Sequence, residues 1–561
     1  MQALTVQQRI LLCVFFTLLC VAMFSPIANN HYLPISPDFV NHLAIILQAK
    51  LALSEGQFPI RVAPWQDHGF GNAFFQFYGS VPYSIAGFIY KFPVHTNPFI
   101  AYKLTIGFFY ILAGIYLFRL VSWLTKSRSI ALLTSVLYLT SPYLLINIDV
   151  RGDFPESVAQ CIVPIALYYT LRCYSHSWNL KRVVWMAISW FLLMSTHLVT
   201  FAYTSIFMGL FLLLITFSSW GTLTSLIRTG VIYLFSFLLT SWFLVPILLT
   251  KNYLFVSGFF TNPMDNAWLT RLPTLLSVSA VSPMPLPGNG ELFFPLYAAV
   301  GWPLLIAVGL LIYLSLEKKL APADKKNKLL WPLFTIFLLA LFSVWSPVDF
   351  WKHLPTFLKF LQFTYRLLTQ VMWAGALLFC FALAAVFKEG LTARQMAIGI
   401  LLLGLSAGSW LSTPQSNPIT INKIIASPDM GYAKHDYLVK TDFVPETLLP
   451  KNKIATNLEK NCSRMNHEII CHINNKNESS VQLPVLYYPK LLKVSVDGND
   501  VSYFPLRYKK ELALTGINLA RGPHVVQAEF NGITWANQLS LFAWIILLAG
   551  FIVAYWPKRS Q

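Results

Sequence analysis

The stretch ALLTSVLYLTSPYLLINIDVRGDFPESVAQCIVPIALYYTLR, residues 131–172, places two long apolar runs on either side of a short charged segment. In that segment four ionisable residues fall within eight positions: Asp149, Arg151, Asp153 and Glu156. Apolar runs of this kind are typical of membrane-spanning helices. Ionisable residues so close to hydrocarbon are costly and are usually functional or paired with one another. The stretch therefore predicts two membrane helices joined by a loop that carries chemistry.

The composition of the whole chain extends this pattern. Of its 561 residues, 56% are hydrophobic, 15% are aromatic and only 11% are charged. Soluble proteins carry about 25% charged residues, so the soluble and disordered classes are excluded. The net charge of +18 would indicate nucleic-acid binding in a soluble protein. In a membrane protein the same excess reflects basic residues that anchor cytoplasmic loops. The position of the charges along the chain therefore decides between these two interpretations.

Apolar runs predict a polytopic α-helical membrane protein of about twelve transmembrane helices. The expected spans are 10–28, 98–118, 129–147, 157–171, 183–196, 199–219, 229–250, 292–315, 330–346, 367–387, 395–411 and 538–556. Segment 73–92 is also apolar, but Gly79, Pro82 and Gly87 favour a re-entrant or interfacial helix there. The chain thus divides into a membrane domain (1–411) with an outer loop (29–97), an extracytoplasmic domain (412–537), and a final helix with a basic cytoplasmic tail (538–561).

The charge distribution supports this topology. With a cytoplasmic amino terminus and twelve spans, 17 of the 41 basic residues but only three of the 23 acidic residues fall in inner segments. The inner side then carries +14 and the rest of the chain +4. If 73–92 crossed the membrane, the basic clusters at 119–128 and 318–328 would lie outside, against the positive-inside rule. Both termini are therefore expected in the cytoplasm, and no nucleic-acid partner is expected. A cleaved signal peptide at the first run is the alternative for that segment.

The first outer loop contains SPDFVNHLAIILQAKLALSEGQFPIR, residues 36–61. Ser36 is a favourable N-cap, and Asp38 falls in the first turn, where the helix dipole favours a carboxylate. The helical spacing of Asp38, Asn41, His42 and Gln48 predicts one polar face on an amphipathic helix that lies on the membrane surface. Asp38 is interpreted as a base or metal ligand, with a helix-capping role as the alternative. His42 either orients Asp38 or acts directly.

The outer segments supply the other candidate site residues. An arginine in this setting suits a phosphate or a carboxylate, because its planar fork forms two parallel hydrogen bonds. For Arg151 an internal pair with a neighbouring acid is the alternative, and Arg366 would suit snorkelling to the interface as well. The full set of candidates beyond Asp38 and His42 is Arg61, Arg151 and Arg366 for phosphate, and Asp67, His68, Asp149, Glu156 and His197 as residues lining the substrate.

The composition becomes polar over 412–537. Alternating segments at 483–489, 491–505, 511–516 and 524–532, with turns at Asp497–Gly498 and Arg521–Gly522, predict a small β-sandwich. Cys462 and Cys471 are the only cysteines placed outside the membrane, and a disulfide between them is expected in an oxidising compartment.

These motifs together resemble a bacterial family of membrane proteins labelled "6-pyruvoyl-tetrahydropterin synthase-related", which is close to the YfhO-type membrane proteins. The resemblance is carried by the opening loop with Asp38 and His42 and by six further segments. These are EGQFPIR (55–61) with FYGSVPYS (77–84), VRGDFPES (150–157), STHLVT (195–200), LQFTYRLL (361–368) and LPVLYYPKLLKVSVDG (483–498). The label does not imply pterin chemistry.

The resemblance implies a glycosyltransferase of the GT-C type in the bacterial cytoplasmic membrane, with its active face on the outer side. Such inverting enzymes transfer a sugar from a polyprenyl-phosphate carrier to an acceptor of the cell envelope. The acidic residue of the first outer loop, here Asp38, would act on the acceptor or bind a divalent metal. The next residue is Phe39, so the family's common second acid is absent. A non-catalytic lipid or polysaccharide transporter and an envelope assembly factor are the alternatives.

Overall fold

The computed structural model describes most of the chain. The described residues are 4–31, 33–34, 36, 38–175, 178–255, 263, 270–278, 299–317, 327–355, 358–411, 420–427, 437–440, 452–453, 461–465, 467–509 and 512–556. The basic loop at 318–326, much of 412–460 and the basic tail at 557–561 therefore lie outside the described residues.

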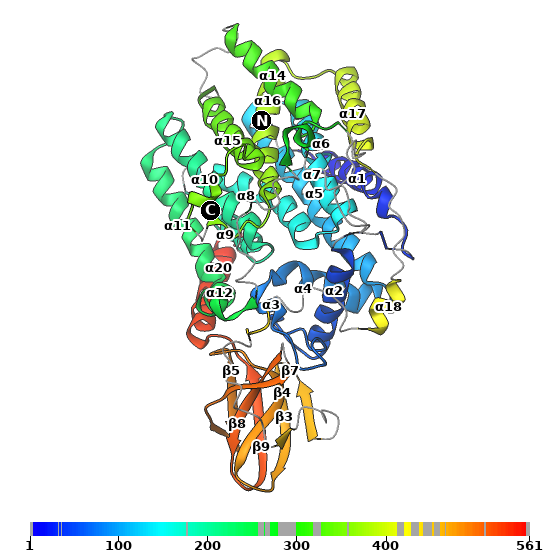
Figure 1. Cartoon of the computed structure of the whole chain (residues 1–561). Helices are drawn as coiled ribbons and strands as arrows, with labels where there is room; N and C mark the ends of the chain where they lie inside the picture. The colour runs from blue at the N-terminus through cyan, green and yellow to red at the C-terminus, as the bar shows by residue number, and fades with distance from the viewer. Residues whose placement is uncertain are drawn as a thin grey trace.

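The protein is mostly helical, with a β-domain projecting from one end of a helical body (Figure 1). The longer helices of the body are α1 (Val6–Met23), α2 (Phe39–Ser54), α4 (Ser80–Ile89), α5 (Pro98–Thr125), α6 (Arg128–Leu139), α8 (Phe154–Ser175), α9 (Leu180–Met194), α10 (Leu198–Phe217), α11 (Leu223–Leu239), α12 (Ser241–Thr250), α14 (Trp302–Leu316), α15 (Leu330–Trp345), α16 (Leu368–Val386), α17 (Ala393–Gly408) and α20 (Thr534–Tyr555). Short elements join them: α3 (Phe74–Phe77), α7 (Pro142–Leu145), α13 (Leu272–Leu275), α18 (Ile421–Ala426), the π-helices η2 (Tyr90–Val94) and η3 (Ile146–Arg151), and the 3-10 turns η1 (Ser25–Ile27), η4 (Lys251–Tyr253), η7 (Asn327–Leu329), η8 (Trp351–His353) and η10 (Thr364–Leu367).

Each of the twelve predicted spans overlaps one of these helices, but not all are long enough to cross a bilayer. Among the described residues, five helices are long and apolar enough: α1, α5, α10, α16 with η10, and α20. Two bent pairs raise the number to seven, α6 with α7 and η3 (46°), and α11 with α12 and η4 (75°). The chain is therefore an integral membrane protein, while the number of twelve spans stays a prediction.

The apolar segment at 73–92 is not a single span. It folds into α3, α4 and the beginning of η2. With ten residues, α4 is about 15 Å long, half of the hydrocarbon thickness. This agrees with the re-entrant or interfacial helix expected from Gly79, Pro82 and Gly87.

The helix expected on the membrane surface, α2, lies inside the protein instead. Its predicted apolar residues Phe39 and Leu43 are buried, but so are His42 and Gln48 from the predicted polar face. The helix packs against α4, α5 and α18. The loop after α2 folds back over this helix, so the polar residues of α2 contact protein groups rather than water. For example, the amide of Trp65 donates to Gln48 Oε1 at 3.0 Å.

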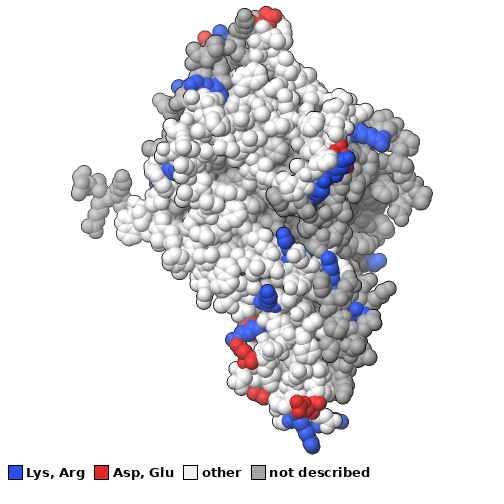
Figure 2. All heavy atoms as spheres, turned by 60° about the vertical axis from the view of Figure 1, so that its left-hand side comes forward, with Lys and Arg blue, Asp and Glu red and all other residues white. Residues whose placement is uncertain are grey.

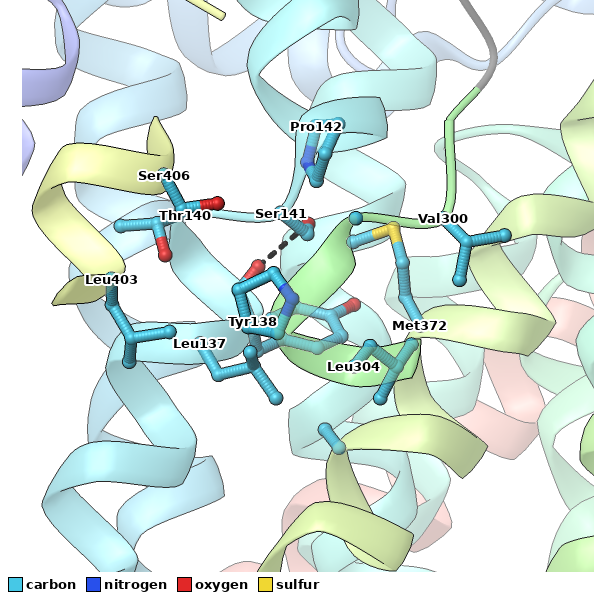
Figure 3. A pocket seen from close by; sticks show the side chains of 13 residues that line it. Leu137, Tyr138, Thr140, Ser141, Pro142, Val300, Leu304, Met372, Leu403 and Ser406 are labelled. Atoms are coloured by element: carbon cyan, nitrogen blue, oxygen red, sulfur yellow. Dashed lines mark hydrogen bonds between the residues drawn. The ribbon is translucent and has the colours of Figure 1, made fainter. Parts of the chain in front are cut away.

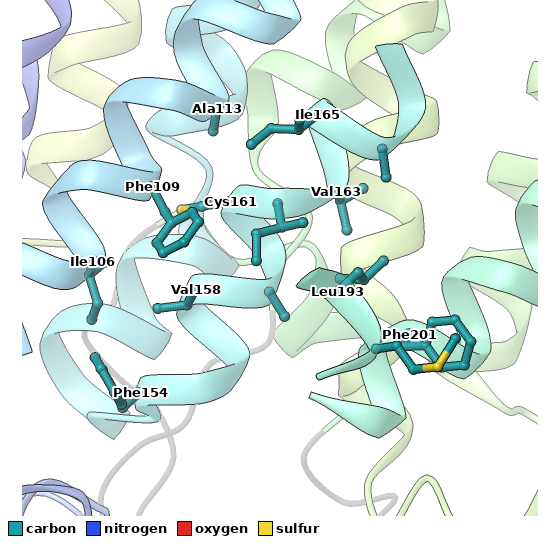
Figure 4. Close-up of a cluster of buried hydrophobic side chains, with 14 of the residues drawn as sticks. Ile106, Phe109, Ala113, Phe154, Val158, Cys161, Val163, Ile165, Leu193 and Phe201 are labelled. Carbon is teal, nitrogen blue, oxygen red and sulfur yellow. The ribbon is translucent and has the colours of Figure 1, made fainter. Parts of the chain in front are cut away.

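The core of the body is a continuous packing of apolar side chains. Figure 4 shows a part of it, where Ile106 and Phe109 of α5 lie beside Val158 and Cys161 of α8. A second packing centre lies between α6, α14, α16 and α17 and contains only a small hollow of about 20 Å³, beside which Ser141 Oγ donates to the carbonyl of Tyr138 (Figure 3). The body is thus close-packed between its two ends.

The β-domain is a sandwich of two sheets. One sheet has the order β1 (Asn452–Lys453), β4 (Ser479–Leu486), β8 (Leu512–Leu519) and β7 (Phe504–Lys509). The other has the order β2 (Cys462–Met465), β3 (Glu468–Asn475), β9 (Gly522–Phe530), β5 (Leu492–Val496) and β6 (Asn499–Asp500). The predicted strand domain is therefore present. Cys462 lies opposite Cys471 on the β2–β3 ladder, and the two form a disulfide.

Charged side chains are unevenly distributed over the surface of the molecule (Figure 2). On the face drawn in Figure 2, the helical body is largely without charge, whereas acidic and basic side chains stand together at the tip of the β-domain. A largely uncharged surface of this kind on the helical body suits contact with the hydrocarbon core of a bilayer.

Candidate active site

A cavity of about 460 Å³ opens at the end of the helical body that carries the β-domain. It lies between the beginning of α2, the loop before α8, the beginning of α10 and the segment that leads into η10. Five of the predicted site residues line it: Asp38, His42, Arg151, His197 and Arg366. Aromatic rings supply much of the remaining wall, namely Phe74, Phe77, Tyr78, Phe360, Phe363, Tyr365 and Tyr437.

The loop between η3 and α8 fits closely against the beginning of α2. Gly152 has a φ of 72°, and a Cβ added there would lie 2.7 Å from Cγ of Phe39, so only glycine is accommodated. The amide of Asp38 donates to the carbonyl of Arg151 at 3.2 Å. Two segments more than 100 residues apart are thereby held together, which brings Asp38 beside the charged loop.

Arg151 is the centre of the charged cluster. Its Nε lies 3.3 Å from Asp38 Oδ2, its Nη2 lies 2.9 Å from Asp153 Oδ2, and its Nη1 lies 2.9 Å from Glu156 Oε2. All three guanidinium nitrogens are therefore engaged by carboxylates. The internal pairing expected as the alternative for Arg151 is present, so this arginine organises the acids, and its binding of a phosphate stays a prediction.

Glu156 joins the two arginines of the site. Its side chain is fully buried, and Oε2 also lies 3.3 Å from Nε of Arg366. The hydroxyl of Tyr143 donates to its other oxygen, Oε1. Glu156 therefore does not line the cavity; it lies behind the wall and holds Arg151 and Arg366 in place.

His42 bridges a tyrosine and an acid. Its Nδ1 lies 2.7 Å from the hydroxyl of Tyr83, and its Nε2 lies 3.9 Å from Asp153 Oδ1. Burial raises the pKa of the Asp153 carboxyl, but Arg151, His42, His197 and Arg366 together outweigh burial and hold that pKa below its ordinary value. Asp153 is thus an anion that orients His42. Sequence reasoning treated Asp153 only as a member of the charged loop.

Asp38 is the carboxylate of the cluster that remains accessible from the cavity. Its side chain is 29% exposed, compared with 3% for Asp153 and none for Glu156. Although it stands at the first position before α2, it makes no capping bond; Ser36 Oγ accepts from the amide of Phe39 instead. Burial raises the pKa of the Asp38 carboxyl by more than the charge of Arg151 lowers it. The capping interpretation of Asp38 is therefore not supported.

Arg366 differs from Arg151 in the partners that it has. Its Nη1 donates to the carbonyl of Leu361 at 3.3 Å, and its Nε faces Glu156. Within the described part of the chain, no hydrogen bond is seen for its Nη2. Lys251, which follows α12, adds a second cation to the cavity wall. Sequence reasoning missed Lys251, although its place directly after an apolar run was the available signal.

His197 reaches the cavity because two backbone segments meet. A Cβ on Gly79 would lie 1.8 Å from the carbonyl oxygen of Thr196, so the glycine permits the contact. The amide of Val81 donates to the carbonyl of Ser195 at 3.2 Å. Nδ1 of His197 lies 2.8 Å from Thr200 Oγ1 at the beginning of α10, so the ring has a capping role as well as a place in the wall.

Four predicted site residues are not brought to the cavity. Arg61 lies at the junction with the β-domain, where Nη1 donates to Gln76 Oε1 and Nη2 to Asn537 Oδ1, both at 2.7 Å. Asp67 is buried and accepts from Asn72 Nδ2 at 2.8 Å, while its neighbour His68 is exposed beside Phe70. Asp149 is buried within η3. Their positions in the fold, rather than their chemistry, separate them from the site.

The described residues do not fit a divalent cation. Among them, no group of three or more His, Cys, Asp or Glu side chains is placed to hold one. The three carboxylates that converge on the site already share the guanidinium of Arg151. A divalent metal therefore stays a prediction.

No protein-family model and no curated protein matches the chain, so the resemblance found in the sequence motifs stays a prediction. Solved structures that resemble it include the arabinofuranosyltransferase AftD from Mycobacteria, at 12% identity and a TM-score of 0.43 over 73% of this chain. The apo oligosaccharyltransferase of Archaeoglobus fulgidus resembles it at 14% identity and a TM-score of 0.45 over 79% of this chain. The chain spans 27% of the length of the first protein and 62% of the second. At this similarity the matches assign no residue a role.

Proposed function

We propose that the protein is a membrane glycosyltransferase that moves a sugar from a polyprenyl-phosphate carrier to an acceptor of the cell envelope. The observation that carries the proposal is the cavity at the β-domain end, whose wall contains the accessible carboxylate of Asp38, the guanidinium-bearing Arg366 and several aromatic residues. The transporter alternative expects ionisable residues at mid-membrane depth. These residues instead gather at one end of the helices.

Asp38 is the general base in this proposal. A base must lose its proton to work and then take one from the attacking hydroxyl of the acceptor. A carboxyl whose pKa is raised by burial holds the accepted proton more firmly than an ordinary aspartate does. Arg151 keeps Asp38 in place without neutralising it fully, because the same guanidinium also serves Asp153 and Glu156.

Arg366 binds the phosphate that leaves with the carrier. As the bond from the sugar to the phosphate oxygen breaks, negative charge accumulates on that oxygen. Arg366 and Lys251 both line the cavity, and their positive charges would stabilise this charge. Aromatic rings such as Phe363 and Tyr437 offer flat apolar surfaces to the faces of a sugar ring. His42, oriented by Asp153 and Tyr83, lies beside Asp38 to bind a hydroxyl of the substrate.

The test is Asp38→Asn in the full-length protein, reconstituted in nanodiscs with a panel of short-chain polyprenyl-phosphate sugars. Release of polyprenyl phosphate is measured together with binding of the donor. We expect turnover to fall about 10²–10⁴-fold, the usual contribution of a general base, while the donor still binds. The matched control is Asp67→Asn, an acid of the same outer loop that lies away from the cavity and should keep wild-type turnover. Unchanged turnover in Asp38→Asn would remove Asp38 from the mechanism.

A further inference from the structure

A second cavity lies at the opposite end of the helical body. Its volume is about 680 Å³, and it is enclosed by α1, α5 and α8. Both α5 and α8 begin near the candidate active site and run away from it. Arg172 follows Phe154 by 18 residues along α8, which places it about 27 Å along the axis from the active-site end. The two cavities are therefore separate, and neither shares a residue with the other.

Three arginines from three different helices line this second cavity: Arg9 of α1, Arg119 of α5 and Arg172 of α8. The guanidinium of Arg119 lies 4.9 Å from the centre of the Tyr168 ring, and that of Arg172 lies 5.0 Å from the centre of Trp123. Stacking on aromatic rings fixes the plane of a guanidinium and leaves its N–H edge available. Arg119 and Arg172 are therefore held in place by ring contacts that do not use up their hydrogen-bonding groups.

No ion pair neutralises these arginines within the described ranges. Arg9 donates only to a backbone carbonyl, that of Leu4, at 3.1 Å. Nε of Arg172 is buried and has no hydrogen-bond partner there. A buried donor without a partner is costly, and three like charges around one space repel one another. An anion in the cavity would relieve both, and a phosphate group suits the fork of arginine best.

The remaining wall of the cavity is apolar and continues to the surface of the protein that faces lipid. Leu12, Ile115 and Phe118 lie beside the arginines. The outer face of α1 is strongly exposed, with Val6 at 71% and Ile10 at 58%. A ligand with a phosphate head and hydrocarbon tails would match both parts, whereas a soluble phosphate would leave the apolar wall unused.

We infer that this three-arginine cavity binds the phosphate headgroup of an anionic membrane lipid, with the acyl chains lying along α1 and α5. Basic pockets between membrane helices are suited to such headgroups because attraction to the phosphate adds to burial of the tails. By the charge distribution of the sequence, this end faces the cytoplasm. The inference does not depend on the proposed glycosyltransferase function.

The experiment is native mass spectrometry of the purified full-length protein after delipidation, with phosphatidylglycerol or phosphatidylcholine added back. We expect the wild type to retain phosphatidylglycerol at least about tenfold better than phosphatidylcholine, because both phosphates can bind arginine but the arginines repel the choline cation of phosphatidylcholine. The double variant Arg119→Gln/Arg172→Gln should lose this preference. The control Lys388→Gln/Arg394→Gln removes two basic residues that do not line the cavity and should keep it.

Two results would overturn the inference. One is a double variant with the lipid preference of the wild type. The other is a wild-type protein that is stabilised against heat by inorganic phosphate as strongly as by phosphatidylglycerol, which would assign the cavity to a soluble phosphate compound. If the double variant does not fold, the single variant Arg119→Gln replaces it, because this side chain is exposed. Arg119→Gln should reduce the preference for phosphatidylglycerol over phosphatidylcholine. An unchanged lipid preference would count against the inference.

Discussion

The two cavities of the helical body use arginine in opposite ways. At the β-domain end, Arg151 is surrounded by Asp38, Asp153 and Glu156, each within 3.3 Å of a guanidinium nitrogen. At the far end, Arg119 and Arg172 stack on aromatic rings, with no carboxylate partner among the described residues. An arginine that is paired with carboxylates fixes the geometry of its site. An arginine that contacts only aromatic rings keeps its positive charge available to bind a ligand. The same residue type therefore organises one site and forms the binding surface of the other.

The largest expected effect is the loss of the buried acid at the active-site end. Glu156→Ala would leave Arg151 and Arg366 buried with too few carboxylates. Removing one partner of a buried ion pair destabilises a protein by about 3–5 kcal/mol. Thermal unfolding in detergent should show a large decrease in midpoint temperature for this variant. An unfolding midpoint temperature within a degree or two of that of the wild type would contradict this expectation. It would mean that water or other groups already stabilise the charges of Arg151 and Arg366.

Arg366→Gln tests whether Arg366 binds the donor. A hydrogen bond to a charged group contributes about 1.5–3 kcal/mol, so donor affinity should fall by about 10–150-fold. Titration of a polyprenyl-phosphate sugar into the reconstituted variant measures this. Lys359→Gln is the matched control, because Lys359 lies on the same segment but its ammonium donates to the carbonyl of Lys352. Equal affinities of the two variants would argue against Arg366 as the phosphate ligand.

Arg61→Gln separates a role in structure from a role in binding. Arg61 was expected to bind phosphate, but its two hydrogen bonds join the outer loop to Gln76 and to Asn537 of α20. We expect a loss of stability of about 1.5–3 kcal/mol without a change in donor affinity. Unfolding and donor titration on the same preparation distinguish the two roles. A weaker donor affinity at unchanged stability would restore the expectation drawn from the sequence.

The pH dependence of turnover sharpens the assignment of Asp38. Because burial raises the pKa of its carboxyl, the base is protonated, and therefore inactive, at pH values where an ordinary aspartate is already ionised. The acidic limb of kcat/KM should therefore lie above pH 3.9, the pKa of an unperturbed aspartate. An acidic limb at or below that pH would contradict the assignment.

The smallest expected effect concerns stability at the far end. Arg172→Gln removes a charge that has no acidic partner within the described part of the chain, so no carboxylate is left behind. The unfolding midpoint of the delipidated protein should change little, in contrast to Glu156→Ala. A loss as large as that of Glu156→Ala would show that Arg172 is paired in a way that the ring contacts do not explain.

Much of the fold follows from local patterns in the sequence. Each predicted apolar run contains a helix, and 73–92 does not form a span, because the chain is interrupted at Gly79 between α3 and α4; Pro82 and Gly87 lie within α4. The alternating segments after residue 483 are strands, and Cys462 and Cys471 lie opposite each other. The prediction for α2 was wrong in one respect. The helical spacing of its residues was predicted correctly, but the loop that follows α2 covers the polar face. Hydrophobic periodicity carries no information about such a contact.

The site was predicted less completely, since it depends on contacts between distant segments. Asp38, His42, Arg151, His197 and Arg366 come together as expected of residues at the outer ends of helices. Arg61, Asp67 and His68 have suitable chemistry, but they lie toward the β-domain. Lys251 directly follows an apolar run, a signal that the sequence-based expectations did not use, whereas the orienting role of Asp153 had no distinct local signal.

The sequence by itself determined that this is a membrane protein, that helices occupy its apolar runs and that a strand domain precedes the last helix, because hydropathy and residue alternation are local properties of the chain. Only the tertiary structure decided which ionisable groups are neighbours. The close contact of Gly152 with Phe39 brings Asp38 to Arg151, and the packing of α1, α5 and α8 gathers three arginines that are far apart in the chain. In an interior of low dielectric constant, the charge of each ionisable group and its freedom to bind a ligand depend on its neighbours. The packing of the helices therefore determines the chemistry of both sites.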